Sequence, residues 1–418
     1  MPSPGQPSEN NDVRMRGFLR RTPVAEVLAW VDQQAAHPLG MEQVPLELAA
    51  GRMLAQPIVS QINVPAFPRS MMDGYAVKAA DIDSASSYNP LPLRILGQSM
   101  PGHAFSGEVV AGSAVRIMTG APLPAGADAV VPAEQTEVSA SEVLVHGSVP
   151  VAKNVSFPGE DIKQDSVLLT PPRRLRPQDV GVLSSIGVGL VPVIQKPRVR
   201  LVITGNELLT AGTPPTGHRI ADANGPMLAA LVARDGGTVI NPGIISDEES
   251  SILGALDDDA DVIIVSGGSS VGQEDLAPVL LAKHGTLAIH GIAMRPSSPA
   301  GMGLMGNRLV FLLPGNPVSC LCAYDFFAGR AIRQLAGRSA AWPYRQEKLP
   351  LLRKLVSSIG RVDYARVKVQ DGQVEPLAIS GAAILSSTTR ADGFVIIPPE
   401  SEGYPAGDQV TVYFYDSE

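Results

Sequence analysis

Cysteine is scarce in this chain of 418 residues, which contains only Cys320 and Cys322. The two lie two positions apart in an expected helix and point to different sides of it, so a disulfide between them is not expected. Thiols without a disulfide framework are typical of a reducing compartment. Residues 1–15 are polar and proline-rich; they predict a disordered tail and no signal peptide. We therefore expect a cytoplasmic protein.

Long apolar runs are also missing, so no membrane-spanning segment is expected. Aromatic residues make up only 5% of the chain, whereas 41 glycines and 37 prolines predict many turns and small β-rich units. Basic residues are fewer than acidic ones, 33 against 41, which gives a net charge of −8. This balance argues against binding of nucleic acid. An anionic ligand would have to be held by local dipoles and a few cations. The length predicts two to four domains.

The first half of the chain predicts one clear helix and a small all-β unit. Apolar residues repeat at helical spacing from Val24 to Val31, so we expect a helix from Thr22, as its cap, to about residue 36. Short apolar runs over 91–150 alternate with glycine and proline, which is typical of short strands. The other expectations here are a helix over 46–54, a strand over 75–77 after the turn Asp73–Gly74, strands over 115–119 and 129–132, a helix over 177–187 and a proline-bracketed connector over 191–197.

From Val199 onward, buried strands alternate with helices, which predicts a doubly wound parallel sheet. The expected strands cover 199–203, part of 238–245, 262–265 and 309–313, and the expected helices cover 226–234, a segment opened by a capping box at 246–249, 276–283 and a long apolar stretch to about 335. Turns at 204–207, 266–272 and 314–316 follow three of these strands, and ligands bind at such carboxyl ends. Short strands over 349–356, 363–369, 393–398 and 410–415 predict a terminal β domain.

One stretch combines a buried strand, a glycine-rich loop and a helix start. The strand Val262–Val265 runs into a loop of three serines and three glycines, and Asp275 opens the next helix. Free backbone N–H groups and the helix dipole make such a loop a candidate phosphate cradle. Its candidate ligand-binding residues are Ser266, Gly267, Gly268, Ser269, Ser270 and Gly272.

Six motifs occur in an order and spacing that resemble a known family. They are Ser-Met-Met-Asp-Gly-Tyr-Ala from Ser70, Arg-Ile-Met-Thr-Gly-Ala-Pro from Arg116, Gly-Glu-Asp from Gly159, Thr-Gly-Asn-Glu-Leu from Thr204, Ser-Gly-Gly-Ser-Ser-Val-Gly from Ser266 with Asp275, and Leu-Pro-Gly-Asn-Pro-Val-Ser from Leu313. The chain resembles the molybdenum-insertion enzymes of molybdenum cofactor synthesis, of the MoeA and gephyrin E-domain type. The resemblance covers residues 20 to 415.

This resemblance implies an enzyme that inserts molybdate into adenylylated molybdopterin with release of AMP and with Mg²⁺ as cofactor. It also implies a homodimer, with molybdopterin adenylyltransferase and molybdoenzymes or their chaperones as partners. The implied catalytic residues are Asp73, Thr119, Asp161, Glu207, Asp247 and Asp275, of which Glu207 and Asp275 would hold the metal. Besides the serine and glycine loop, the implied ligand-binding residues are Pro314, Gly315, Asn316, Pro317, Arg295, Pro296, Ser319 and Arg366. Structural alternatives stay open for Asp73 and Asp161 as turn carboxylates, for Asp247 as a helix cap and for Arg366 in a surface salt bridge.

The implied architecture has four domains after the tail. A discontinuous dimerisation domain would comprise 16–60 and 155–195, and a small β-rich domain 61–154 would reach the site of the other subunit. Residues 196–340 would form the α/β pterin-binding domain. Residues 341–418 would form a β-barrel-like C-terminal domain.

Five positions depart from the family pattern, and the departures keep other functions open. Cations, a carboxylate or a hydroxyl are replaced at Asn206, Gly291, Ser298, Ser156 and Ala382. Each charge-assisted contact contributes roughly 1.5–3 kcal/mol, so several losses would weaken anion binding. The alternatives are a catalytically weakened paralogue that binds molybdopterin or acts as a scaffold, and a generic nucleotide-binding α/β protein.

Overall fold

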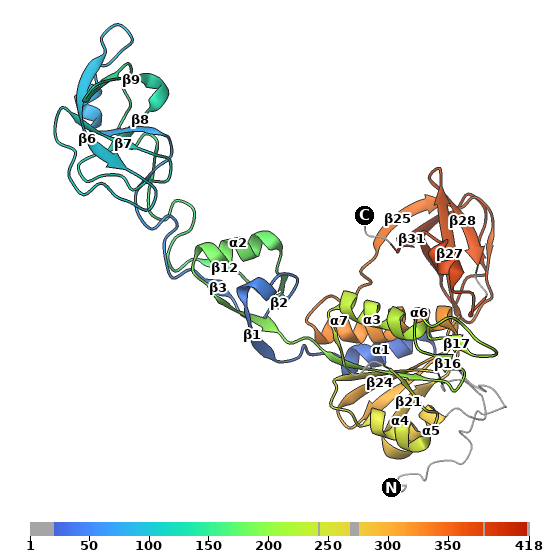
Figure 1. The fold of residues 1–418 in the computed structure, drawn as a ribbon. Helices are drawn as coiled ribbons and strands as arrows, with labels where there is room; N and C mark the ends of the chain where they lie inside the picture. Colours follow the sequence, from blue (N-terminus) through green and yellow to red (C-terminus); the bar gives the residue numbers. More distant parts are fainter. Residues whose placement is uncertain (1–20, 241–242, 268–275, 379–380, 416–418) are drawn as a thin grey trace, which may run out of the picture. The chain divides into compact units, whose positions relative to one another are not determined.

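The computed structural model describes residues 21–240, 243–267, 276–378 and 381–415 (Figure 1). The described residues fall into two compact units: the inserted unit, Gln43–Val193, and the main unit, formed by the segments before and after it. The main unit contains the α/β sheet and the C-terminal β domain (Figure 1). No helix of these described ranges is both long and apolar enough to cross a membrane.

A mixed sheet forms the centre of the main unit. Its parallel strands are β15 (Arg198–Thr204), β18 (Thr238–Ile240), β19 (Ile244–Ile245), β20 (Val262–Ser266) and β24 (Arg308–Leu313). The strands β23 (Gly301–Met305) and β21 (Thr286–His290) continue it antiparallel, in the order β18-β15-β20-β24-β23-β21. The prediction of a wholly parallel sheet is therefore wrong at this edge. The chain turns back there at Gly306, whose φ of 60° suits a tight hairpin, whereas a parallel connection needs a crossover.

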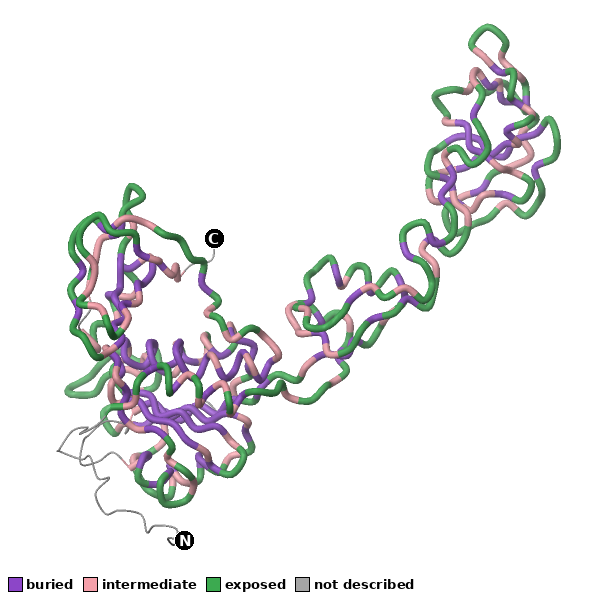
Figure 2. Tube along the Cα trace, turned by 180° about the vertical axis from the view of Figure 1, so that it is seen from behind, coloured by how far each residue is buried: buried purple, intermediate pink, exposed green. Residues whose placement is uncertain are grey.

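Helices cover both faces of this sheet (Figures 1 and 2). One face carries α1 (Val24–Gln34), α3 (Asn224–Asp235), α6 (Pro317–Ala323), the π-helical turn η4 (Tyr324–Ala328) and α7 (Gly329–Leu335), and the other carries α4 (Glu249–Leu256) and α5 (Leu276–His284). All five residues of β20 are buried between the two layers. The unbroken apolar run of that strand thus correctly predicts a strand covered on both faces.

Helix α1 packs on the main unit, whereas the family resemblance implies a domain that combines its residues with 155–195. Its buried face, Val24, Val27 and Val31, joins the same apolar cluster as the central strands. At its far end the Asp32 carboxylate accepts hydrogen bonds of 2.6 and 2.8 Å from the Arg330 guanidinium of α7. Periodic apolar spacing identifies the buried face of such a helix but not the domain that it covers.

Four local predictions need correction. Thr22 does not cap α1, since its backbone pairs with Gly291 and Ala293 instead. The expected helix 46–54 is a short 3₁₀ turn, η1 (Leu46–Leu48), followed by the strand β2 (Met53–Leu54). The expected capping box at 246–249 is not formed. The connector 191–197 contains the strand β14 (Leu190–Ile194), in which Val191 and Val193 are buried despite the proline between them.

The two thiols are buried in α6 and are free, as expected. Burial raises the pKa of Cys320 to about 12, because desolvation disfavours the thiolate. The long apolar helix after residue 317 is interrupted by the π-helical turn η4.

The C-terminal sheet takes one strand from the α/β domain. Its order is β22 (Met294–Arg295), β27 (Val362–Gln370), β29 (Gly393–Ile397), β31 (Gln409–Phe414) and β25 (Arg345–Pro350), with β28 (Gln373–Ala378) on β27 and a separate pair of β26 (Leu355–Val356) and β30 (Gly403–Tyr404). Met294 and Arg295 pair in parallel with Val362 and Asp363. This pairing joins the two domains at the level of Arg295. The barrel-like closure of the sheet stays a prediction.

The inserted unit contains the expected small β structure. Its larger sheet has the order β8 (Ala129–Pro132), β5 (Gly74–Val77), β7 (Ser113–Ile117), β6 (Leu91–Ser99), β10 (Glu142–Val145) and β9 (Thr136–Ser139), with the turn η2 (Ala79–Ile82) and η3 (Ala133–Gln135) beside it. A second sheet has the order β1 (Met41–Pro45), β14, β2 and β13 (Arg173–Arg174), and α2 (Pro177–Ser185) packs on it. Two short ladders join β3 (Ile58–Val59) to β12 (Val167–Leu169) and β4 (Arg69–Ser70) to β11 (Val155–Ser156).

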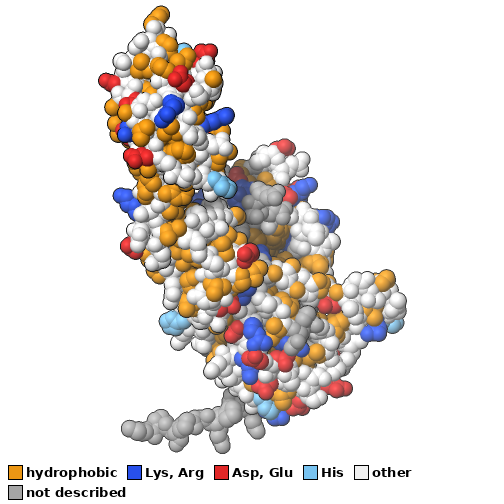
Figure 3. Space-filling model, turned by 60° about the vertical axis from the view of Figure 1, so that its left-hand side comes forward, with side chains coloured by type: hydrophobic (Ala, Val, Ile, Leu, Met, Phe, Trp, Pro, Cys, Tyr) orange, Lys and Arg blue, Asp and Glu red, His pale blue; other side chains and the backbone are white. Residues whose placement is uncertain are grey.

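Acidic and basic side chains intermingle on the face shown in Figure 3. This distribution agrees with the net charge of −8 and gives that face no broad basic field. A basic stripe would be the electrostatic footprint of a nucleic-acid partner.

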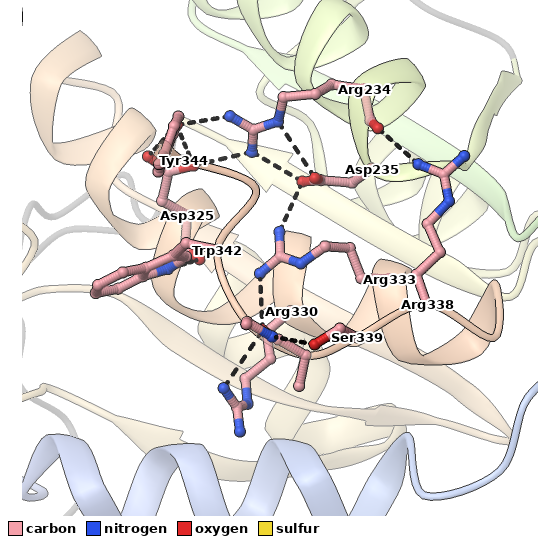
Figure 4. A network of polar contacts seen from close by, with 11 residues as sticks. Arg234, Asp235, Asp325, Arg330, Arg333, Arg338, Ser339, Trp342 and Tyr344 are labelled. Atoms are coloured by element: carbon pink, nitrogen blue, oxygen red, sulfur yellow. Dashed lines mark hydrogen bonds and ion pairs between the residues drawn. The ribbon is translucent and has the colours of Figure 1, made fainter. Parts of the chain in front are cut away.

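A buried network of charges anchors the segment that leads into the C-terminal domain (Figure 4). The Arg234 guanidinium lies 2.9 Å from the Asp235 carboxylate and 3.0 Å from that of Asp325, and Arg333 lies 3.0 Å from Asp235. The Tyr344 hydroxyl donates to Asp325 at 3.0 Å. Two arginines and two fully buried aspartates thus balance in charge, which buried ions require.

Aromatic packing continues this anchor into the C-terminal sheet. The Trp342 ring packs edge-on against Phe326 and Tyr413, at 4.9 Å between centroids in both cases. Its indole N–H donates to the Asp325 carbonyl at 2.8 Å. Such aromatic pairs add to the apolar area that they bury, so the two domains of the main unit share one core.

We predict that Asp325→Ala lowers the free energy of unfolding by about 3 kcal/mol, because it leaves buried arginine charge without its partner. The matched control is Asp32→Ala, whose carboxylate is 39% exposed in its pair with Arg330. Removing such a solvent-accessible pair is expected to cost about 1 kcal/mol or less. Urea unfolding of the full chain measures both values, and equal losses would contradict a structural role for the network.

Candidate active site

Three strand tips of the α/β sheet line one cavity of about 530 Å³, which we call the Glu207 cavity. It lies where β15, β20 and β24 end, at the carboxyl edge of the parallel strands. The sequence-predicted residues that line it are Glu207, Asp247, Ser266, Gly267, Gly315, Asn316 and Pro317. The predicted Gly268, Ser269, Ser270, Gly272 and Asp275 lie outside the described residues. Ligands of open α/β sheets bind at this edge.

Close backbone approach holds the strand tips together. A Cβ atom on Gly267 would lie 2.2 Å from the Thr204 carbonyl oxygen, and the φ of Gly267 is 99°. Only glycine fits both conditions without displacement of the backbone. The tips of β15 and β20 can therefore approach as closely as they do only with glycine at this position.

Asn224, which was not among the residues predicted from the sequence, links the ends of β20 and β24 through hydrogen bonds. Its side-chain amide donates to the Ser266 hydroxyl at 2.9 Å and to the Gly315 carbonyl at 2.8 Å. The side chain is buried at the first position of α3. An asparagine before an apolar helix usually indicates a cap, and the sequence contains no signal for this bridging role.

The Glu207 cavity is acidic. Three carboxylates line it, Glu207, Asp222 and Asp247, and its described lining includes no lysine or arginine. Asp247 accepts the backbone N–H of Asn206 at 3.1 Å, and Asp222 accepts that of Gly225 at 2.9 Å. Asp247 therefore holds the turn after β15 and does not cap α4, whereas Asp222 caps the amino end of α3. Carboxylate oxygens suit Mg²⁺, which takes one or two of them together with substrate phosphates. No group of three potential ligands within the described ranges is close enough to hold a metal ion alone.

A second cavity, of about 720 Å³, adjoins the first, and we call it the Arg295 cavity. Its charged lining consists of Arg21, Arg295 and Arg361, and the described residues that line it include no carboxylate. Hydroxyls come from Ser297, Ser298, Ser319 and Ser358, and the predicted Pro296 and Pro314 also line it. Gly315 and Asn316 line both cavities.

An ion pair forms the wall between the Arg295 cavity and the C-terminal sheet. The Arg295 guanidinium donates to both carboxylate oxygens of Asp363, with Nε at 3.1 Å from Oδ1. The Ser357 hydroxyl donates to the same carboxylate at 2.6 Å, and Asp363 is fully buried. Ser297 donates to the Ser319 carbonyl at 2.5 Å, which connects the cavity floor to α6.

Arg366 is not brought to either cavity. Its side chain is fully buried in β27, where it lies opposite Phe394 of the neighbouring strand. The surface salt bridge considered for it is therefore excluded by its position. Six consecutive residues of β27 are buried, so this strand has no solvent-facing side there, which the alternating sequence pattern does not predict.

The other predicted site residues lie in the inserted unit. The Asp73 carboxylate accepts the backbone N–H and the hydroxyl of Thr119, each at 2.7 Å. These bonds, the backbone one first, lower the pKa of Asp73. Thr119 and Asp161 line a third cavity of about 530 Å³ together with Arg69, Ser70, Ser156 and Glu160.

Family models and curated relatives match nearly the whole chain. The matching models are "MoeA N-terminal region (domain I and II)" over residues 22–187, "Probable molybdopterin binding domain" over 200–334 and "MoeA C-terminal region (domain IV)" over 348–415. The molybdopterin molybdenumtransferase of Haemophilus influenzae is 32% identical over 395 residues, which cover 91% of this chain and 95% of the relative. That of Bacillus subtilis is 32% identical and covers 89% of both chains.

Solved structures agree with the sequence relatives. The molybdopterin biosynthesis MoeA protein of Pyrococcus horikoshii superposes with a TM-score of 0.80 at 30% identity and covers 96% of this chain and 100% of that one. A second crystal structure of that MoeA protein gives a TM-score of 0.75.

We predict that Thr119→Val raises the pKa of Asp73, because valine removes one of the two hydrogen bonds that stabilise the carboxylate. A lowered pKa in the folded state adds stability above the pKa of the unfolded chain, and this stability is lost as the pH falls through the folded value. The variant should therefore lose part of this contribution at neutral pH.

Carboxyl resonances followed by NMR titration measure the shift directly. Thr136→Val is the control, because its hydroxyl donates to the Ala133 carbonyl. An unchanged Asp73 titration in Thr119→Val would refute the assignment.

Proposed function

This chain belongs to the MoeA family of molybdopterin molybdenumtransferases and has a role in molybdenum cofactor biosynthesis, and we propose that its reaction takes place across the two adjoining cavities. The supporting observation is their opposite charge: carboxylates line the Glu207 cavity, arginines line the Arg295 cavity, and Gly315 and Asn316 belong to both. The reaction has two anionic ends, the phosphoanhydride of adenylylated molybdopterin and the incoming molybdate. Two compartments with different charge suit these two ends.

The phosphoanhydride end belongs in the Glu207 cavity. Backbone N–H groups at the ends of β20 and β24 would bind its phosphate oxygens. Three carboxylates alone would repel phosphate, so this cavity needs a cation between the two. Mg²⁺, when bound, supplies that charge neutralisation, and Glu207 with Asp275 would hold it. The observed acidity of the cavity fits this cofactor.

The molybdate end belongs in the Arg295 cavity. Arginine side chains bind oxyanions through several N–H groups, and charge-assisted bonds of this kind are stronger than neutral ones. Serine hydroxyls can donate to the remaining oxygens. A pterin that crosses Gly315 and Asn316 would present its dithiolene sulfurs to the molybdate while its anhydride stays in the Glu207 cavity. Binding in the two cavities would fix the position and orientation of the reacting groups. This lowers the entropic part of the activation barrier.

Asp73, Thr119 and Asp161 would complete the site of the partner subunit in a homodimer. Asp73 is ionised at neutral pH, as a metal ligand or anchor for a cationic group requires, and the hydrogen bonds from Thr119 stabilise the charged form further by lowering its pKa. The enzyme would work in the cytoplasm, where molybdopterin adenylyltransferase supplies its substrate and molybdoenzymes or their chaperones receive the product.

One observation favours a second function. The Arg295 charge is bound to Asp363 rather than free in the cavity, so oxyanion binding rests on fewer cations than the cavity lining contains. A chain with weak oxyanion binding would act as a molybdopterin-binding scaffold.

We predict molybdate-dependent release of AMP from adenylylated molybdopterin by the full chain, and a fall in its turnover of about 100-fold in Glu207→Gln. Glutamine keeps the size of the side chain but removes the charge, so pterin binding should persist. The control is Glu249→Gln, an exposed carboxylate that pairs with Lys283. Tight pterin binding without any AMP release by the unaltered protein would establish the scaffold instead.

A further inference from the structure

Three separate segments supply the positive charge of the Arg295 cavity. Arg21 precedes α1, Arg295 lies on β22 and Arg361 immediately precedes β27. The family pattern led us to select Arg295 alone among them. The contacts of the three guanidinium groups show that their charges are not equally available.

The charge of Arg295 is neutralised by its ion pair with Asp363. Arg295 donates to both oxygens of Asp363, whose side chain is fully buried. A buried carboxylate without its cation would be strongly destabilising. The guanidinium therefore cannot leave Asp363 for a ligand without a large cost, although it borders the cavity.

Arg361 is held more loosely. Its Nε lies 3.5 Å from the Asp363 carboxylate, and its Nη2 lies 3.4 Å from the Ser358 hydroxyl. Both distances exceed those of strong charge-assisted hydrogen bonds, which are about 2.7–2.9 Å. With 34% of its side chain exposed, Arg361 can turn toward a ligand.

Arg21 borders the same cavity, whose described lining includes no carboxylate to neutralise it. Its backbone position is fixed by the next residue: Thr22 donates to the Gly291 carbonyl at 2.9 Å and accepts from the Ala293 N–H at 2.9 Å. The φ of Gly291 is 88°, a conformation that disfavours any other residue. Gly291 stands where the family pattern has a lysine, and the segment that pairs with it carries Arg21, which lines the cavity.

We infer that Arg21 and Arg361 bind the oxyanion in this chain, and that Arg295 is a positioning residue that acts through Asp363. This inference rests on the proposed function, since molybdate is taken as the oxyanion. It assigns the site to two residues outside the family motifs, one from the N-terminal segment and one from the C-terminal domain. Binding of the ligand would thus depend on residues from both domains of the main unit.

The test is calorimetric titration of the full-length protein with sodium molybdate. Arg21→Ala and Arg361→Ala should each weaken molybdate binding about tenfold, the loss of one charge-assisted contact. Arg21→Lys should recover most of the affinity, because the charge remains. Arg353→Ala removes an exposed arginine that pairs with Glu375 and does not line the cavity, so it controls for net charge and should bind as the unaltered protein does.

Arg295→Gln separates positioning from binding. It should lower the melting temperature clearly, while the affinity of the folded protein for molybdate falls less than in Arg21→Ala. The inference is overturned if Arg21→Ala and Arg361→Ala bind like the unaltered protein, or if Arg295→Gln alone abolishes binding without loss of stability. Either result leaves the proposed function intact. If the unaltered protein neither binds molybdate nor releases AMP, the proposed function fails as well.

Discussion

The pairing of β22 with β27 is the constraint on which the site depends, and the Arg295–Asp363 ion pair secures it. It adds a strand of the α/β domain to the C-terminal sheet and makes one wall out of two domains. Asp363 is fully buried and binds Arg295 through both oxygens. Arginine suits this role better than lysine, because its planar guanidinium matches a carboxylate bidentately. Arg295 thus has a structural role as well as a place in the cavity lining.

The charge asymmetry of the two cavities follows from this arrangement. The segments around the strand ends supply the Glu207 cavity with carboxylates, whereas the junction of the two domains supplies the Arg295 cavity with arginines. In the proposed function, a substrate with a phosphoanhydride at one end and an oxyanion-binding group at the other would have one favourable orientation. The shared residues Gly315 and Asn316 place the two halves in contact. Local cations and dipoles achieve this in a chain whose net charge is −8.

Sequence patterns predicted the parts of the fold that rest on local hydrophobic order. The apolar runs of β15, β20 and β24 appear as expected because burial on both faces leaves a continuous signal, and the turns after β15 and β24 follow them. The antiparallel strands β21 and β23 were missed, since the glycines of β23 weaken any strand pattern. The bridging role of Asn224 could not be found, because it comes from contacts with distant segments, and the place of Asp222 in the cavity lining likewise depends on the fold. The burial of Arg366 could not be predicted, because exposure of a β27 residue depends on what packs on both faces of the sheet.

The effect of the departures from the family motifs depends on all the charges around the cavity and not on the motifs alone. From the motif alone, the lysine that is absent at Gly291 would be counted as a lost contact with an anion. In the structure, the backbone bonds of Thr22 to Gly291 and Ala293 hold the segment whose Arg21 lines the Arg295 cavity. An anion responds to the positions of charges and not to the segment that carries them. A motif that has lost a cation therefore does not by itself show a weaker site, because a neighbouring segment can restore the charge at a position that no local pattern marks.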